Sequence, residues 1–320
     1  MKNLKIVSLF AGIGGFELGL AELGKPVFVN EFNKFSAQTY QANFPTHNLI
    51  TEDIRTIKEE EIPSHDILVG GFPCQTFSAA QQHKDKRGLN DPRGHLFKEI
   101  LRIAKYHKPT WLFLENVKGL TFKPNQEAFR QIINGIKELG YQVNWKILNA
   151  RDFGLPQNRE RIFFVANRLG IDFTFPEPPK LATKASDIFE KNIDSKYHLS
   201  EKTWTSLKAR KEKNLAKGSS LGYKMFDENS PYINTLTTNS ASEYVIKEGD
   251  KMRKLTPREC LRLQGFKDDY QIVVSDHQTY RQAGNAVAIP VIRAIGNRIK
   301  ETFANFLKET GLYNFTHNDL

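Results

Sequence analysis

Residues Ile6-Val7-Ser8-Leu9-Phe10-Ala11-Gly12-Ile13-Gly14-Gly15 join an apolar run to a glycine-rich turn, and a helical pattern follows at residues 16–23. A strand, a glycine turn and a helix in this order are typical of nucleotide-binding α/β folds, because glycine lets the backbone approach a ligand closely and the helix start offers free N–H groups. The turn lacks the third glycine of a G-x-G-x-x-G loop, and no Walker-type G-x-x-x-x-G-K-[ST] occurs. With nothing basic nearby, the turn favours an adenosyl group over a triphosphate; a simple tight turn is the alternative.

The first half of the chain continues this alternation of strand and helix, which predicts an α/β fold with parallel strands. Gly24 and Gly140 each follow a helical pattern, so we predict a left-handed helix cap at both glycines. Strands are expected at residues 5–10, 27–31, 66–70, 111–116, 141–148 and 161–166, and helices at 16–23, 34–43, 94–105 and 126–139.

Three prolines in Phe175-Pro176-Glu177-Pro178-Pro179 predict a domain boundary, since proline continues neither a helix nor a central strand. Regular structure is expected to resume after residue 253. There, Thr256 can cap a helix with Pro257 at its first position and Glu259 completing the capping box.

The net charge is +10 and the isoelectric point is about 9.4, which favours a polyanionic partner such as nucleic acid. Residues 202–224 contain seven basic residues and one acid, and this segment is either a phosphate-binding surface or a solvated helix face. No apolar run approaches the roughly 18 residues of a membrane helix, and residues 1–5 leave no room for a signal peptide. We therefore expect a cytoplasmic protein.

Cys74 lies in Gly70-Gly71-Phe72-Pro73-Cys74-Gln75, where a buried strand is expected to end in a loop. With two cysteines, the chain has neither a disulfide framework nor a multi-cysteine metal site, so Cys74 is a candidate nucleophile. The alternative is a small buried residue, because free cysteine is often buried. Cys260 lies in a helical pattern and is expected in the core or an interface.

Further polar residues stand at expected strand ends, where open α/β sheets bind ligands. Glu115 could hold or deliver a proton there, or could cap the next turn. Glu31 stands where a ribose-binding carboxylate is expected, and Asp53 is either a ligand contact or a helix cap. Arg159 and Arg161 are two residues apart at the start of a strand, where one could pair with a bound anionic or carbonyl group.

Several motifs follow one another in a fixed order between residue 5 and about residue 300. They are residues 10–16, 30–32, 53–54, 71–78, 91–97, 115–117, 157–161, 253–266 and 284–287. The same motifs in the same order characterise the DNA cytosine C5-methyltransferases of bacterial restriction-modification type, which the chain resembles.

The resemblance implies a Rossmann-like sheet of the S-adenosylmethionine-dependent methyltransferases and a smaller, irregular target-recognition domain. It places the catalytic and cofactor-binding domain at residues 1–175, completed by 276–320, and the target-recognition domain at 176–275. The cofactor would be S-adenosylmethionine, with S-adenosylhomocysteine as product and no metal. The cofactor-binding positions implied are Phe10, Gly12, Gly14, Glu31, Phe32, Asp53, Ile54, Pro73, Leu96, Asn285 and Val287.

For catalysis, the resemblance implies that Cys74 adds to C6 of cytosine while Glu115 holds N3 and the exocyclic amine. Arg159 and Arg161 would brace the base carbonyl and the catalytic loop, and residues 78–93 would close over DNA. The target base must be flipped out of the duplex to be reached. The DNA-binding positions proposed are Gln75, Ser78, Lys208, Arg210, Lys211 and Thr237.

Two departures from the family pattern are Glu52, where glycine is common, and Phe32, where tryptophan is common. A zinc deaminase is a poor alternative, since Pro73-Cys74 lacks the second cysteine of P-C-x-x-C. A tRNA cytosine C5-methyltransferase on the same core and a catalytically idle DNA-binding regulator stay open. We expect a monomer on double-stranded DNA, associated with the nucleoid, with a possible cognate restriction endonuclease. The recognition sequence is not predictable from these motifs.

Overall fold

The computed structural model describes residues 3–72, 96–179, 181–239 and 243–311. The chain forms two compact units. Unit 1 comprises Met1–Asn149, Glu160–Pro178 and Ile289–Leu320, and unit 2 comprises Ala150–Arg159 and Pro179–Ala288. Residues 150–159 and 276–288 cluster with unit 2, whereas the family resemblance implies that they belong to the catalytic domain.

Unit 1 is built on a seven-stranded sheet with the order β3-β2-β1-β4-β5-β8-β6. From β3 to β5 neighbouring strands are parallel, whereas β8 is antiparallel to both β5 and β6. The predicted parallel orientation is therefore wrong for β8. A parallel return needs a crossover of a dozen or more residues, usually a helix, and only residues 150–159 connect β6 to β8. The strands are β1 (Leu4–Leu9), β2 (Gly24–Asn30), β3 (Leu49–Ile50), β4 (Ile67–Gly71), β5 (Trp111–Val117), β6 (Gln142–Asn149) and β8 (Glu160–Asn167).

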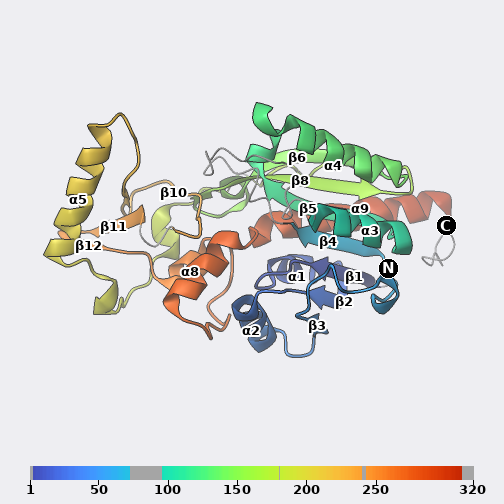
Figure 1. Cartoon of the computed structure of the whole chain (residues 1–320), viewed down its shortest axis with the longest axis horizontal. Helices are drawn as coiled ribbons and strands as arrows, with labels where there is room; N and C mark the ends of the chain where they lie inside the picture. Colours follow the sequence, from blue (N-terminus) through green and yellow to red (C-terminus); the bar gives the residue numbers. More distant parts are fainter. Residues whose placement is uncertain (1–2, 73–95, 180, 240–242, 312–320) are drawn as a thin grey trace. The chain divides into compact units, whose positions relative to one another are not determined.

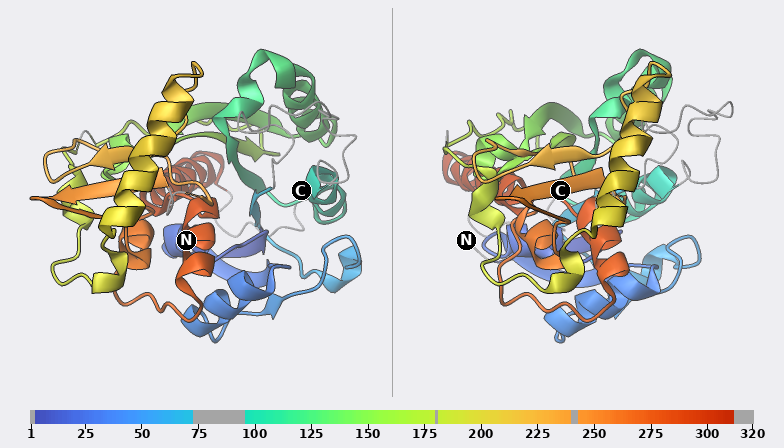
Figure 2. Two further views of the ribbon diagram at one scale, coloured as in Figure 1. Left: turned by 60° about the vertical axis from the view of Figure 1, so that its left-hand side comes forward. Right: turned by 90° about the vertical axis from the view of Figure 1, so that its left-hand side faces the viewer.

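Helices cover both faces of this sheet (Figures 1 and 2). On one face, α3 (Leu96–His107) and α4 (Gln126–Glu138) bury apolar side chains in the main core cluster. On the other face, α1 (Gly15–Leu20) packs closely on α9 (Ile289–Thr310). A Cβ atom at Gly19 would lie 2.5 Å from Ile292, so glycine is required for this approach. A further α-helix, α2 (Lys34–Asn43), follows β2.

The two glycines that were predicted to cap helices behave differently. Gly140 has a φ of 84°, so the predicted left-handed cap after α4 is confirmed. Gly24 instead begins β2, and the prediction there is wrong. A Cβ atom at Gly24 would lie 2.1 Å from the carbonyl oxygen of Leu4 on β1, so this glycine is needed for strand pairing.

A buried carboxylate in unit 1 was not expected from the sequence. Glu17 on α1 is 8% exposed, and neither of its carboxylate oxygens has a hydrogen-bond partner among the described residues. Burial raises the pKa of Glu17 from its ordinary value of 4.5 to about 7, and the neighbouring Ser8 hydroxyl offsets only part of this effect.

Unit 2 contains short strands, the α-helices α5 (Glu201–Leu215), α7 (Pro257–Arg262) and α8 (Asp276–Asn285), and several 3-10 helices within its described residues. The pair β7 (Gln157–Asn158) and β10 (Ile233–Asn234) is parallel, and β9 (Lys224–Phe226), β11 (Tyr244–Glu248) and β12 (Lys251–Arg253) form a small sheet. The predicted capping box of Thr256 and Glu259 is confirmed at the start of α7. Of the helices in the described ranges, none is long and apolar enough to cross a membrane.

Candidate active site

The glycine turn after β1 is held by a carboxylate at the end of β2. Glu31 accepts hydrogen bonds from the backbone N–H of Gly12 at 2.8 Å and of Asn33 at 2.7 Å. Burial raises the pKa of Glu31, although these two donors favour its ionised form. Asn33 in turn caps α2 with its side chain. The predicted residues Gly12 and Glu31 are thus in direct contact.

The backbone of this turn is unusual in its conformation. Phe10, Gly12 and Gly14 have φ angles of 56°, 59° and 86°, a region that side-chain-bearing residues seldom adopt. No atom of the described residues outside the turn lies within 4 Å of a Cβ built at Gly12. Such strain in a non-glycine residue is often found at ligand sites, so the position of Phe10 is consistent with ligand binding.

The other predicted cofactor residues in unit 1 have different surroundings. Phe32 is 68% exposed, so its ring face is available for stacking on a planar ligand. Asp53 forms an ion pair with Arg55, whose hydrogen bond lowers the pKa of this carboxyl. Ile54 is 2% exposed and its side chain belongs to the core, and Leu96 is half-buried against the same core. An open glycine turn, a carboxylate and an exposed aromatic ring fit an adenosyl group.

Glu115 lies near the end of β5, beside the end of β4. Its register partner on β4 is Gly71, and Asn116 donates a hydrogen bond from Nδ2 to the carbonyl oxygen of Phe72 at 3.2 Å. The last described residues before Cys74, Gly71 and Phe72, therefore lie directly beside Glu115 and Asn116. Cys74 itself, with the predicted residues Pro73, Gln75 and Ser78, lies outside the described residues, as do residues 79–95.

Glu115 and Arg161 form a largely buried ion pair in unit 1. Arg161 Nε lies 3.1 Å from Glu115 Oε1, and the two side chains are 15% and 11% exposed, Arg161 being the more exposed. Adjacent antiparallel strands bring them together, since Arg161 on β8 is the register partner of Val117 on β5. The charge of Arg161 can fix the orientation of the carboxylate, as expected for a group that must meet a base edge.

Arg159 has a different environment, in unit 2, and is 2% exposed. Its guanidinium donates to the backbone carbonyl oxygens of Leu236 at 3.0 Å, Gly284 at 3.2 Å and Ala286 at 2.7 Å. The two arginines of the motif, predicted together as catalytic residues, therefore serve different partners. Of the other predicted residues in this unit, Thr237 and Asn285 are exposed and Val287 is 8% exposed.

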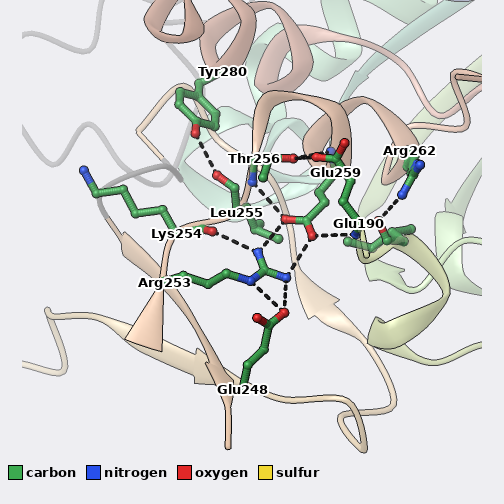
Figure 3. Close-up of polar contacts among 10 residues, drawn as sticks. Glu190, Glu248, Arg253, Lys254, Leu255, Thr256, Glu259, Arg262 and Tyr280 are labelled. Atoms are coloured by element: carbon green, nitrogen blue, oxygen red, sulfur yellow. Dashed lines mark hydrogen bonds and ion pairs between the residues drawn. The ribbon is translucent and has the colours of Figure 1, made fainter. Parts of the chain in front are cut away.

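A second buried arginine organises the motif at residues 253–259 (Figure 3). Arg253 and Glu259, both fully buried, form a two-pronged ion pair with distances of 2.8 and 2.9 Å. Arg253 Nε also donates to Glu248 at 2.7 Å, and Tyr280 Oη donates to the carbonyl oxygen of Leu255 at 2.7 Å. This network joins β11, β12, α7 and α8, and only its capping box was predicted from the sequence.

The basic segment of unit 2 forms α5, which runs beside the small sheet (Figures 1 and 2). Lys208 Nζ lies 5.5 Å from the ring centroid of Trp204, and Lys211 Nζ lies 4.4 Å from that of Tyr223. These two lysines are half-buried, whereas Lys202, Arg210 and Lys213 are exposed. Of the three predicted phosphate-binding residues, Lys208 and Lys211 thus pack on aromatic rings. Arg210 is exposed and has basic neighbours.

Comparisons with known proteins agree with the motifs. The family model described as C-5 cytosine-specific DNA methylase matches residues 4–301. The Type II methyltransferase M.SsoII of Shigella sonnei is 46% identical over 309 residues, covering 93% of this chain and 80% of that protein. The Type II methyltransferase M.NlaX of Neisseria lactamica is 44% identical over 304 residues, covering 92% of this chain and 96% of that protein.

Solved structures support the fold. The Entamoeba histolytica methyltransferase EhMeth matches with a TM-score of 0.76 at 19% identity, over 96% of this chain and 99% of that chain. A putative DNA modification methyltransferase from an Escherichia coli prophage matches with a TM-score of 0.73 at 22% identity, over 94% and 100%. The Rossmann-like fold and the resemblance inferred from the motifs are confirmed, and the chain belongs to the C-5 cytosine-specific DNA methylase family.

Proposed function

We propose that this enzyme, a DNA (cytosine-5)-methyltransferase, acts through a transient bond between Cys74 and C6 of a cytosine flipped out of duplex DNA. The observation that carries the proposal is the Glu115–Arg161 ion pair, which lies where β4 leads toward Cys74. Addition of a thiol to a pyrimidine ring requires a nucleophile and a carboxyl group that is held in position; Glu115 is so held, and Cys74 follows β4 by three residues in the sequence.

The cofactor side of this proposal rests on the turn after β1. Gly12, Gly14 and Glu31 would hold the adenosyl and amino-acid groups, Phe32 would stack on the adenine, and Asp53 would contact its edge. Pro73, Leu96, Asn285 and Val287 are further cofactor-binding positions that the family resemblance implies. When bound there, S-adenosylmethionine supplies an electrophilic methyl group.

The chain's own residues would activate the base. As the Cys74 sulfur bonds to C6, Glu115 delivers a proton to N3, so the electron pair of the C5–C6 double bond becomes available at C5. After methylation, C5 loses its proton to a base, the C6–sulfur bond breaks, and Cys74 leaves as the ring regains its aromaticity. Arg161 would hold Glu115 in the orientation that faces N3.

Two cysteines in the chain allow a matched test of this mechanism. Cys74→Ser should bind DNA and cofactor but lose methyl transfer, because a serine hydroxyl is far less ionised than a thiol. Cys260→Ser serves as the control, since Cys260 is 1% exposed in α7 and burial raises the pKa of its thiol. Full activity of Cys74→Ser would remove Cys74 from the mechanism.

Duplex DNA carrying 5-fluorocytosine at the target tests the covalent step directly. Fluorine at C5 cannot leave as a cation, so the C6–sulfur bond should persist and give a denaturant-resistant adduct with wild type and with Cys260→Ser. Cys74→Ser should give no adduct. If wild type methylates DNA but is not trapped, the covalent step is refuted.

The proposed DNA contacts of unit 2 are centred on α5. We assign phosphate contact to Arg210 with its exposed neighbours Lys202 and Lys213, because these charges face solvent. Lys208 and Lys211 would contribute from their positions over aromatic rings, and Thr237 would lie near the bases. Bisulfite sequencing of DNA from cells that express the enzyme would give the recognition sequence and the modified cytosine.

Several features of the biological setting are also proposals. We infer a cytoplasmic, nucleoid-associated monomer that protects host DNA beside a cognate restriction endonuclease. The two relatives reported above are Type II methyltransferases, which supports the proposed role in a restriction-modification system. Methyl transfer to transcribed tRNA, assayed beside duplex DNA, tests the alternative substrate. Activity on tRNA alone would overturn the DNA assignment.

A further inference from the structure

Arg159 joins two segments of unit 2 that are far apart in the sequence. Its Nη1 donates to Leu236 in the stretch 235–238, and its Nη2 donates to Gly284 and Ala286 in the stretch 284–287. The side chain is 2% exposed, so water cannot readily replace a carbonyl partner that moves away. The guanidinium therefore favours one relative position of the two stretches.

The same two stretches also touch directly. A Cβ atom at Gly284 would lie 2.5 Å from the carbonyl carbon and oxygen of Thr237 and 2.7 Å from the nitrogen of Thr238. Because all three atoms belong to backbone, only glycine allows this approach. A shift of one stretch must therefore move the other or open a gap between them.

Two buried glutamines reinforce the arrangement. Gln157 accepts from the N–H of Leu236 at 2.9 Å and donates to the carbonyl oxygen of Leu263 at 2.6 Å. Gln264 donates to the carbonyl oxygen of Ala283 at 2.7 Å. Both glutamines are fully buried. The backbone around residues 236 and 284 is thus bonded to side chains from β7 and the end of α7, and Arg159 contacts both stretches.

We propose that Arg159 is a positioning residue that couples DNA binding to cofactor binding by linking residues 235–238 to residues 284–287. This inference rests on the proposed function, in which Thr237 lies near DNA and Asn285 and Val287 contact the cofactor. A ligand that holds one stretch also fixes the other through the guanidinium and the Gly284 contact. By linkage, each ligand then changes the affinity of the other by the same factor.

The experiment measures this factor in the full-length protein. Affinity for a fluorescent duplex that contains the modified site is determined with and without saturating S-adenosylhomocysteine, at one salt concentration. Wild type should bind DNA roughly 5-fold to 150-fold more tightly with the product bound, the usual range of coupling between sites. In Arg159→Lys, which keeps the charge but cannot reach three carbonyls, this ratio should fall toward 1.

Arg258→Lys is the matched control. Arg258 also donates to two backbone carbonyl oxygens in unit 2, those of Lys267 at 3.2 Å and Tyr270 at 2.8 Å, but it has no hydrogen bond to either stretch among the described residues. The ratio of DNA affinities with and without S-adenosylhomocysteine should be the same in Arg258→Lys as in wild type. A wild-type ratio of 1, or an unchanged ratio in Arg159→Lys, would overturn the proposal.

If Arg159→Lys does not fold, Gly284→Ala provides a second test, because it perturbs the contact between residues 235–238 and residues 284–287. Its added methyl group must separate residues 284 and 237 while Arg159 stays in place, so the ratio should again fall, and an unchanged ratio would refute the coupling. Methyl transfer is measured in the same wild-type sample. An active enzyme with no coupling refutes the role of Arg159 alone, whereas failure of methyl transfer and of 5-fluorocytosine trapping refutes the proposed function.

Discussion

Replacing Glu17 with glutamine should stabilise the protein at pH 8 and leave its stability nearly unchanged at pH 4.5. A carboxyl with a pKa of about 7 when folded and 4.5 when unfolded destabilises the folded state by about 3 kcal/mol once it is ionised. Between these two values the folded protein holds a proton that the unfolded chain has released. The contribution of Glu17 to stability therefore decreases as the pH rises through this window, and above pH 7 the decrease is complete.

The assay is urea unfolding of the cofactor-free protein at pH 4.5, 6 and 8, with wild type and Glu17→Gln compared at each pH. The difference in unfolding free energy should grow from near zero to about 3 kcal/mol across the series. Glu22→Gln, at an exposed position in the same unit, is the control and should show no such trend. A difference of the same size at all three pH values would refute the reasoning, because it would show that Glu17 does not titrate between the two states.

Three further predictions follow from packing and charge. The double substitution Arg210→Gln and Lys213→Gln should weaken the salt dependence of DNA binding, measured by fluorescence anisotropy. The slope of log affinity against log salt should become less steep by about 0.9 for each phosphate that these side chains neutralise in wild type. An unchanged slope would mean that they do not touch phosphate. Arg253→Met should cost about 3–5 kcal/mol of unfolding free energy in urea titrations, because it leaves the Glu259 carboxylate buried without its ion-pair partner. Gly24→Ala should lower the melting temperature more than Gly140→Ala, since only the first brings a methyl group against a backbone carbonyl; equal decreases would contradict the role assigned to Gly24.

Short sequence patterns correctly predicted those structural features that depend only on neighbouring residues in the sequence. The capping box at Thr256 and the left-handed cap at Gly140 depend on a few consecutive residues, and both are present. Gly24 was misassigned because its requirement comes from Leu4 on a neighbouring strand, which no local rule includes. The direction of β8 likewise depends on the connection that precedes it and not on the apolar run itself.

In the candidate site, too, features with local causes were predicted and features that depend on distant residues were not. The positions of Glu31 and Glu115 at strand ends followed from the alternation of strand and helix, and Glu31 does hold the glycine turn. The spacing of Arg159 and Arg161 could not reveal that one pairs with a carboxylate and the other with three carbonyls, because these partners are up to 127 residues away in the sequence. Glu17 was missed because an acid after a glycine turn is expected at a helix start, and only packing shows that it is buried.

The pairing of α1 with α9 has a consequence for how the chain folds during synthesis. The sheet face that carries Phe113 and Trp111 is covered in part by Phe16 from α1 and Phe303 from α9. A ribosome makes α1 early, but Ile289–Thr310 emerges only after all of unit 2 has been translated. The nascent sheet is therefore expected to expose an apolar surface until the last helix docks, and exposed surface of this kind makes a folding intermediate prone to aggregation.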